Sequence, residues 1–378
     1  MILYDVIVVG SGPSGSMAAY YLAKNGLKVA VLEKENLPRY KTCGGGLVWR
    51  GRKMLPFDIE SVVKKEFNEV DLFFYGQDIH LKSKRDFPVI SMVMRDDFDH
   101  FLVNEAKNSG AEIFTEQKVI SVDCKNDYAE IQTDKSIFNS KYVIAADGVY
   151  STVAKISGWT KDTRKLIPAL EYEIEVGEEE WQRLSKTVRF DIDFISQGYA
   201  WSFPKKNHLS LGLFSSKRDK LDLKLHLKSY VNYLEIKQIK SEQLHGFQIP
   251  ISSRTDGFMK NRVLLTGDAA GLPDPITAEG ISNALLSGQI AAESIIEGQL
   301  DKENIHKIYT QKLNDNIVQE FKSAEYLANL FYNQVKIRNI LIKKYGEKFC
   351  EAMTDIFSGE KRYPKNIAKT LRKKLIGI

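Results

Sequence analysis

The sequence predicts an α/β protein built from a Rossmann-like domain, an interleaved antiparallel-sheet domain and a helical C-terminal region. An apolar strand over residues 4–9 leads through the glycine loop GSGPSG into an Ala-rich helical segment. Around residues 170–194, apolar and polar residues alternate with period two, which is typical of sheet strands. After Asp301 a helical pattern continues almost to the end of the chain.

The first element is a βαβ unit. The β-branched run at 4–9 predicts a strand, Ser14 to Asn25 predict a helix that Gly26 stops, and 28–32 predict a second strand. This second strand ends at Glu33.

The loop between the first strand and the helix has the composition of a dinucleotide site. Gly10 permits the tight turn, Gly12 lets the backbone approach a pyrophosphate, and Gly15 allows the helix to pack on the strand. The helix N-terminus at Ser14 then faces the anion. Glu33 is placed to accept hydrogen bonds from a ribose and would repel a 2′-phosphate, so FAD or NAD is expected rather than NADP.

The middle of the chain alternates between strands and one helix. We expect strands within 71–82, a helix over 96–108 and a stop at Gly110. The apolar positions of that helix are expected on its buried face: Phe98, Phe101, Leu102 and Ala106. Further strands are expected at 111–114, 118–124, 129–133 and 142–146, the last ending at Asp147-Gly148.

Residues 168–214 predict a second domain. Leu170, Tyr172, Ile174 and Val176 alternate with glutamates, and Val188, Phe190, Ile192 and Phe194 repeat the pattern. Such strands are expected to form an antiparallel sheet with one wet face and an inner face that can wall a cavity.

The last third predicts a strand at 262–265, a helix at 281–297 and a helical stripe of Tyr309, Leu313, Ile317 and Phe321. No low-complexity linker separates the parts, so interleaved domains are expected. The predicted boundaries are 1–70, 90–160 and 255–300 for the nucleotide-binding domain, 71–89 and 161–254 for the sheet domain, and 301–378 for the helical region.

Charge and cysteine content narrow the setting. The net charge is +5, but residues 361–378 hold seven Lys/Arg and no acid. This tail, with Ile367, Leu371 and Leu375 at helical spacing, predicts contact with an anionic membrane surface or a solvated helix packed on the body. No apolar run is long enough for a transmembrane helix. Three cysteines without a CxxC pair favour a reducing, cytoplasmic setting. Any peripheral membrane contact is then expected at the inner face of the membrane. The six histidines show no metal-ligand spacing, and no nucleic-acid module accompanies the charge.

Three segments in order, GSGPSG, IAADGVYS at 144–151 and RVLLTGDAAG from Arg262, resemble the fingerprints of the p-hydroxybenzoate hydroxylase superfamily of flavoproteins. The resemblance implies FAD as cofactor and an FAD-binding role for the Rossmann-like domain. It implies that Asp268 binds the ribityl chain and that Gly280 and Ile281 lie at the flavin N1–C2 edge. It also gives Arg95 an FAD contact, unless Arg95 only pairs with Asp96 or Asp99, and gives the Val119 backbone a contact with the adenine.

Two further motifs resemble the geranylgeranyl reductase family. PRYKTCGGGL at 38–47 resembles its CGGG loop, and YAWSFPKKNHLSLG at 199–212 resembles its YxWxFP motif followed by a glycine. This implies that Gly44 and Gly45 lie beside the isoalloxazine, with Cys43 as a loop contact or a catalytic residue. Substrate binding is implied for Tyr199, Trp201, Phe203 and Gly212, with plain sheet core as the alternative. The family's second glycine is replaced by Phe214.

The family implies hydride transfer from reduced flavin to an isolated prenyl C=C bond, with a proton added to the other carbon. The electron donor stays open between NAD(P)H, ferredoxin and another small donor. A flavin monooxygenase or halogenase of the same superfamily is the main alternative. A flavin electron-transfer or redox-sensing protein that binds a lipid without converting it is another.

Overall fold

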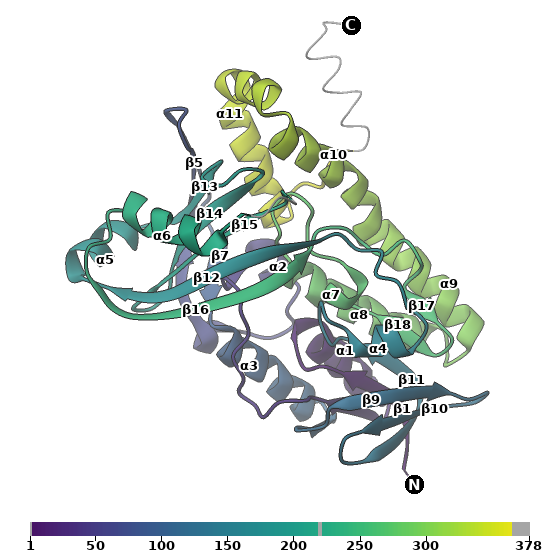
Figure 1. Ribbon diagram of the computed structural model, residues 1–378. Coiled ribbons are helices and arrows are strands. Elements are labelled where there is room, and N and C mark those ends of the chain that lie inside the picture. Colours follow the sequence, from purple (N-terminus) through teal and green to yellow (C-terminus); the bar gives the residue numbers. More distant parts are fainter. Residues whose placement is uncertain (1, 218–220, 365–378) are drawn as a thin grey trace, which may run out of the picture. The chain divides into compact units, whose positions relative to one another are not determined.

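The computed structural model describes residues 2–217 and 221–364, which form two compact units (Figure 1). Among the described residues, unit 1 consists of residues 2–40, 95–166 and 250–322, and unit 2 of residues 41–94, 167–217, 221–249 and 323–364. Each unit is assembled from three separate stretches of the chain, so both are discontinuous.

Unit 1 is built on a parallel sheet with the strand order β18-β11-β1-β2-β8. These strands are β1 (Leu3–Val9), β2 (Val29–Leu32), β8 (Glu112–Phe114), β11 (Ile137–Ala145) and β18 (Val263–Leu265). Antiparallel additions are β17 (Met259–Lys260), β9 (Val119–Cys124) and β10 (Ala129–Thr133). The strand order reverses between β1 and β11, and ligands of such sheets bind at the carboxyl ends of the strands at this switch point.

Helices α1 (Pro13–Lys24), α3 (Arg95–Asn108) and α8 (Ile281–Glu297) pack together in unit 1. A Cβ on Gly288 of α8 would fall 2.0 Å from the backbone oxygen of Ser14, so α1 and α8 pack in close backbone contact. Phe98, Leu102 and Ala106 of α3 are buried as expected, whereas Phe101 is partly exposed. Short helices α4 (Thr152–Ile156) and α7 (Gly267–Ala270) follow strands β11 and β18.

Helix α9 (Lys302–Leu313) continues through a π-helical stretch (Asn314–Val318) into α10 (Gln319–Asn333). The predicted stripe is confirmed, because Tyr309, Leu313, Ile317 and Phe321 are all buried. The Tyr309 hydroxyl donates to the backbone oxygen of Leu265, which ties α9 to the end of β18.

Unit 2 is built on a seven-stranded sheet with the order β16-β12-β15-β14-β13-β5-β6. The strands are β5 (Glu69–Phe74), β6 (Ile79–Lys84), β12 (Leu166–Val176), β13 (Val188–Ile192), β14 (Gly198–Pro204), β15 (Leu209–Ser215) and β16 (Ile239–Pro250). β12, β15, β14 and β13 are antiparallel neighbours as expected, but β13 and β5 run parallel.

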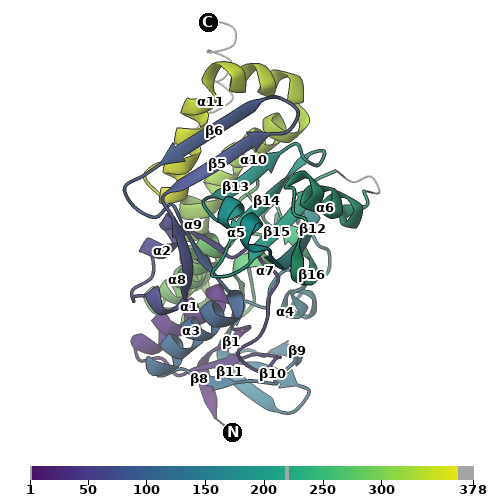
Figure 2. The same cartoon turned by 90° about the vertical axis from the view of Figure 1, so that its left-hand side faces the viewer.

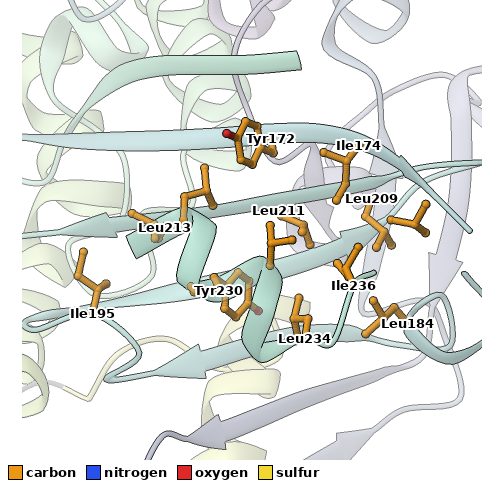
Figure 3. Close-up of a cluster of buried hydrophobic side chains, with 14 residues drawn as sticks. Tyr172, Ile174, Leu184, Ile195, Leu209, Leu211, Leu213, Tyr230, Leu234 and Ile236 are labelled. Carbon is orange, nitrogen blue, oxygen red and sulfur yellow. The ribbon is translucent and has the colours of Figure 1, made fainter. Parts of the chain in front are cut away.

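Helices α5 (Glu178–Leu184) and α6 (Leu223–Tyr233) contribute to an apolar core on one face of this sheet. Figure 3 shows side chains of β12 and β15, including Tyr172 and Leu211, gathered with Tyr230 of α6. The apolar half of the period-two pattern at 170–176 therefore lies in this core.

The prediction of a wet opposite face is wrong. On the face opposite the core, Glu171 is 1% exposed, and on the core face Asp191 of β13 is fully buried. Asp191 accepts hydrogen bonds from Arg189 and from the Tyr230 hydroxyl, which compensate its burial. The alternation located the strands correctly, but it did not show the polar partners that allow burial, which are Arg189 on the same strand and Tyr230 of α6 for Asp191, and Ser210 of β15 for Glu171.

A smaller sheet of β3 (Gly46–Val48), β7 (Ile90–Val93) and β4 (Val63–Phe67) also belongs to unit 2. Helix α2 (Trp49–Lys53) and a 3₁₀ turn (Glu60–Val62) lie between β3 and β4. Helix α11 (Val335–Ser358) packs along β6 of the β5–β6 hairpin (Figure 2).

The two units do not coincide with the predicted domains. Residues 41–70 belong to unit 2 by their contacts, whereas the sequence assigned them to the nucleotide-binding domain. Residues 323–364 also belong to unit 2, whereas the sequence assigned them to a separate helical region. The division into functional domains stays a prediction. None of the described helices is long and apolar enough to cross a bilayer. The basic tail at residues 367, 371 and 375 lies outside the described residues.

Candidate cofactor site and aromatic surface

The glycine loop of unit 1 connects β1 to α1 at the switch point of the parallel sheet. Gly10 has φ +98°, and a Cβ there would lie 2.4 Å from the backbone oxygen of Ala146, at the end of β11. A Cβ on Gly15 would lie 2.0 Å from the backbone oxygen of Gly10. Both positions therefore require glycine, one for the turn and one for the approach of the helix to the loop.

Gly12 is the N-cap of α1 and provides no side-chain hydrogen bond to the first turn of the helix. Side chains near Gly12 are cationic, because a Cβ there would lie 3.9 Å from Nη2 of Arg39 and 3.9 Å from Nη2 of Arg95. A helix N-terminus beside two guanidinium groups suits the charge of a pyrophosphate.

Glu33 at the end of β2 is buried and ionised. Its Oε2 accepts hydrogen bonds from the Ser11 backbone N–H at 3.0 Å and the Ser11 hydroxyl at 2.6 Å, and Oε1 accepts from the Glu35 N–H. Nε of Arg39 lies 3.4 Å from Oε2. Burial alone would raise the pKa of Glu33, but the Arg39 charge and these hydrogen bonds hold that pKa below its usual value.

Arg39 and Arg95 share a buried counter-ion. Nε and Nη2 of Arg95 lie 2.8 Å and 2.9 Å from the two carboxylate oxygens of Asp99, and Arg39 Nη1 lies 3.0 Å from Oδ2. The alternative prediction for Arg95 was a surface ion pair with Asp96 or Asp99. The pair with Asp99 does form, but Asp99 is fully buried on α3. One carboxylate thus orients two cations beside Gly12.

Asp147 stabilises the start of α4. Its carboxylate accepts hydrogen bonds from the Ser151 hydroxyl and the Val153 N–H at the start of α4. Burial raises the pKa of Asp147 in spite of these hydrogen bonds. The Asp-Gly turn after β11 therefore holds α4 against the end of the strand.

Asp268 lies on α7, close to both the glycine loop and the start of α8. Gly267 has φ +53°, and its missing Cβ would fall 2.9 Å from the Ser14 hydroxyl, while Gly280 would place a Cβ 3.8 Å from Asp268 Oδ1. Asp268, Gly280 and Ile281 therefore meet near the N-terminus of α1.

Two buried arginines, Arg164 and Arg254, donate hydrogen bonds to backbone oxygens of α7. The Arg254 guanidinium donates to the backbone oxygen of Ala269 at 3.0 Å, and the Arg164 guanidinium donates to that of Asp268. Cations at the C-terminal carbonyls of a helix are favourable, and here they fix the backbone that carries Asp268.

Val119 begins β9 and is buried. Two residues earlier, the Gln117 N–H donates to the Glu33 backbone oxygen at 2.8 Å. The strand start is thus tied to the residue that ends β2.

In unit 2, the predicted substrate residues form one buried aromatic surface on β14. Tyr199, Trp201 and Phe203 share a face and are 8%, 7% and 8% exposed. Phe190 of β13 contacts Tyr199 and Phe203 edge-on at 5.5 Å and 5.1 Å between ring centroids. We call Tyr199, Trp201, Phe203 and Phe190 the aromatic surface.

The CGGG loop packs against this surface. A Cβ on Gly44 would lie 3.0 Å from the Phe203 ring and 3.2 Å from Nε1 of Trp201. Gly45 has φ +75° and would place a Cβ 2.1 Å from the backbone oxygen of Val93. Cys43 is partly exposed and accepts the Gly45 N–H at 3.5 Å, a contact within the loop itself.

Several of these residues could not be found from motifs. Arg39 follows β2 in an irregular segment and reaches Glu33 and Asp99 only through the fold. Arg164 and Arg254 lie outside every motif. Two signals were available for Arg39: it is a basic residue shortly after the acidic end of the second strand, and it lies within the PRYKTCGGGL segment.

The chain matches the model of the FAD binding domain family over residues 3–289 and belongs to that family. It is 32% identical over 350 residues to an uncharacterized protein of Methanosarcina barkeri, covering 90% of this chain and 87% of the relative. It is 30% identical to digeranylgeranylglycerophospholipid reductase of Thermoplasma volcanium, with 90% and 87% covered. A crystal structure of a geranylgeranyl bacteriochlorophyll reductase-like protein from Thermoplasma acidophilum superposes with a TM-score of 0.77 at 26% identity, covering 94% of this chain and 91% of that one.

The fold, the glycine loop and the family match together define an FAD-dependent flavoprotein. The Glu33 carboxylate suits a ribose, and the Arg39 and Arg95 guanidinium groups suit a pyrophosphate, so these residues fit FAD. The chain is an FAD-dependent oxidoreductase of the geranylgeranyl reductase type. Among the described residues, no cluster of histidine, cysteine or acidic side chains could hold a metal ion.

Proposed function

We propose that this protein saturates carbon–carbon double bonds of a prenyl lipid of the geranylgeranyl type. When bound, FAD supplies the hydride from its reduced ring. The residues of this chain bind that cofactor, exclude water and hold an alkene that offers no polar group for recognition.

In unit 1, the geometry supports an FAD site. Gly10, Gly12, Ser14 and Gly15 would hold the pyrophosphate at the start of α1, and Glu33 would accept the ribose hydroxyls. The remaining proposed contacts are Arg95 beside the pyrophosphate, the Val119 backbone at the adenine, Asp268 at the ribityl chain, and Gly280 and Ile281 at the flavin edge. Gly44 and Gly45 are proposed flavin contacts on the strength of the family resemblance.

The observation that carries the proposed substrate class is the aromatic surface. Three buried aromatic side chains on one strand, extended by Phe190, form an apolar wall without a charged group among them. Such a wall can hold an extended hydrocarbon chain. The relative from Thermoplasma volcanium carries a name that describes reduction of a geranylgeranyl lipid, which supports the same class.

Cys43 is better explained as a loop contact than as a nucleophile. Its sulfur accepts a hydrogen bond from the N–H of Gly45 in the same loop. We therefore propose that Cys43→Ala retains most of the reductase activity, whereas a catalytic role would require its loss.

The experiment is an anaerobic incubation of the reduced FAD-loaded protein with geranylgeranyl diphosphate and with a digeranylgeranyl glycerolipid, followed by mass spectrometry. The proposal expects product masses that rise in steps of two hydrogens. Product that forms only in oxygen and gains an oxygen or a halogen atom would identify a monooxygenase or halogenase. An unchanged lipid that binds to the protein would identify an electron-transfer or sensing role.

The electron donor and the site of action are part of the same proposal. A lipid substrate must be taken from a bilayer, and the basic tail would suit the anionic inner face of the cytoplasmic membrane. NAD(P)H and a ferredoxin can be told apart by which of them bleaches the flavin anaerobically.

A further inference from the structure

Two buried carboxyl groups lie on the same face of the unit 2 sheet as the aromatic surface. Glu171 pairs with Gly212 across β12 and β15, and Glu173 pairs with Ser210. In the next pair of strands, Trp201 stands opposite Gly212 and Phe203 opposite Ser210. Both carboxyl groups therefore share the aromatic face, two strands away from the aromatic rings.

A hydrogen-bonded chain joins one carboxyl group to that surface. The Ser210 hydroxyl donates to Oε1 of Glu171 at 2.6 Å, and the Trp201 indole N–H lies 3.4 Å from the Ser210 hydroxyl. Ser210 is fully buried. This single hydroxyl thus connects Glu171 to the centre of the aromatic surface.

The second carboxyl group, Glu173, is connected to the solvent-exposed side of the cluster. Glu173 forms an ion pair with Lys205 and lies 2.8 Å from Nε2 of His208. Lys205 is 1% exposed, whereas the His208 side chain is 16% exposed and reaches solvent. On the adjoining strand β16, His245 is a further titratable group, and Lys41 lies against the Phe247 ring.

The charge balance requires a proton in this cluster. Lys205 and His208 both contact Glu173, whereas Glu171 accepts its hydrogen bond from the neutral Ser210 hydroxyl, so an ionised Glu171 would be a second buried carboxylate at a large cost. Burial first, then the neighbouring Glu173, raise the pKa of Glu171 to about 7, although the Lys205 charge opposes this. Glu173, held by His208 and Lys205, keeps a pKa below its usual value in spite of its burial.

The CGGG loop lies against the same cluster. A Cβ on Gly45 would lie 3.4 Å from Cε of Lys205, and one on Gly44 would lie 3.2 Å from Nε1 of Trp201. Lys205 and Trp201 therefore connect the carboxyl pair to Gly44 and Gly45, which the family resemblance assigns to the cofactor.

We propose that Glu171 is the proton reservoir of the reaction and delivers its proton toward the aromatic surface through the Ser210 hydroxyl. This inference rests on the proposed function. In each cycle one alkene carbon receives the hydride of the reduced flavin, and the other receives a proton. Glu171 is left as a carboxylate and regains its proton from water by way of His208 and Glu173. Glu171 is thus a positioning residue, because it acts through Ser210.

The test uses FAD-loaded protein and three variants. Glu171→Gln keeps the shape and the hydrogen bond but cannot titrate, Ser210→Ala cuts the connection, and Glu175→Gln on the same strand is the matched control. Flavin absorbance and the thermal midpoint establish that each variant is folded and loaded.

The first readout needs no substrate. Infrared difference spectra between about pH 5 and about pH 9 are expected to show a protonated carboxyl band that titrates near pH 7 in the wild type. The band should persist in Glu175→Gln and Ser210→Ala and vanish in Glu171→Gln. If no such band exists, or if Glu171→Gln retains it, the assignment is overturned.

The second readout is the pH profile of single-turnover prenyl reduction. The wild-type rate should fall above pH 7, while Glu171→Gln and Ser210→Ala should be slower by roughly 10²-fold and lose this profile. A wild-type profile in Glu171→Gln overturns the proposal. A wild-type protein that reduces no prenyl substrate refutes the proposed function, and the infrared band still decides whether Glu171 holds a proton.

Discussion

The Trp201 indole lies directly over Gly212: a Cβ at position 212 would fall 2.0 Å from Cζ2 of Trp201. The two residues stand opposite each other in the β14–β15 pair, so the tryptophan turns across the neighbouring strand into the space that glycine leaves open. The orientation of the largest side chain of the aromatic surface therefore depends on the absence of a side chain at one residue.

Gly212→Ala is expected to displace Trp201 and lower prenyl turnover by at least about tenfold, because even one added methyl group cannot fit. FAD binding should be largely retained, since the residues proposed for the pyrophosphate, the ribose and the ribityl chain lie in unit 1. The comparison is Gly246→Ala on β16, where a new Cβ meets the flexible end of Leu170 at 3.0 Å. Equal activity of the two variants would show that the position of Trp201 does not matter.

Phe214 is expected to limit the substrate. Its ring packs edge-on against Tyr199 with centroids 4.5 Å apart, and it stands where the motif that this segment resembles would have a second glycine. Phe214→Gly should open the end of the aromatic surface and raise kcat/KM for bulkier prenyl compounds relative to geranylgeranyl diphosphate. Competition between two substrates in one vessel measures this ratio directly, and an unchanged ratio would remove Phe214 from substrate selection.

Glu33→Gln is expected to weaken FAD binding by about tenfold or more, because charge-assisted hydrogen bonds to the ribose are lost. Since the pKa of Glu33 is held below its usual value, wild-type affinity should not change with pH above about pH 5. Fluorescence titration of the apoprotein with FAD provides both results. Glu35→Gln, at an exposed position nearby, is the control and should bind FAD normally.

Asp99→Asn is expected to affect both cations at the glycine loop, because one carboxylate pairs with Arg39 and Arg95. Loss of this buried charge leaves two unbalanced guanidinium groups, so we expect a lower unfolding midpoint that FAD or pyrophosphate partly restores. Thermal unfolding with and without pyrophosphate tests this. If added pyrophosphate has no effect on the variant, the two arginines do not form an anion site.

The Glu171 cluster also predicts how stability depends on pH. The folded protein binds a proton at Glu171 up to about pH 7, whereas an unfolded glutamate releases it near 4.5. The stabilisation is therefore complete below pH 4.5 and is lost as the pH rises through 7. The urea midpoint of the wild type should fall across this window relative to that of Glu171→Gln, and parallel curves for the two proteins would contradict the raised pKa.

Local patterns were sufficient to predict the parts of the fold that repeat within a short stretch of chain. The βαβ unit around Gly10 and the helix from Ile281 were confirmed because each depends on its own glycines and apolar spacing. Burial of Glu171 could not be predicted, since its partner Ser210 becomes a neighbour only when β12 pairs with β15. Arg39 was missed for the same reason, because its contact with Asp99 spans 60 positions of the chain.

The most direct measurement of the central claim is stopped-flow absorbance of the reduced protein, mixed without oxygen with a geranylgeranyl lipid. The predicted result is that the bleached flavin becomes yellow again, with one FAD reoxidised for each double bond saturated. A flavin that stays bleached with every prenyl compound until oxygen is admitted would contradict the assignment as a prenyl reductase.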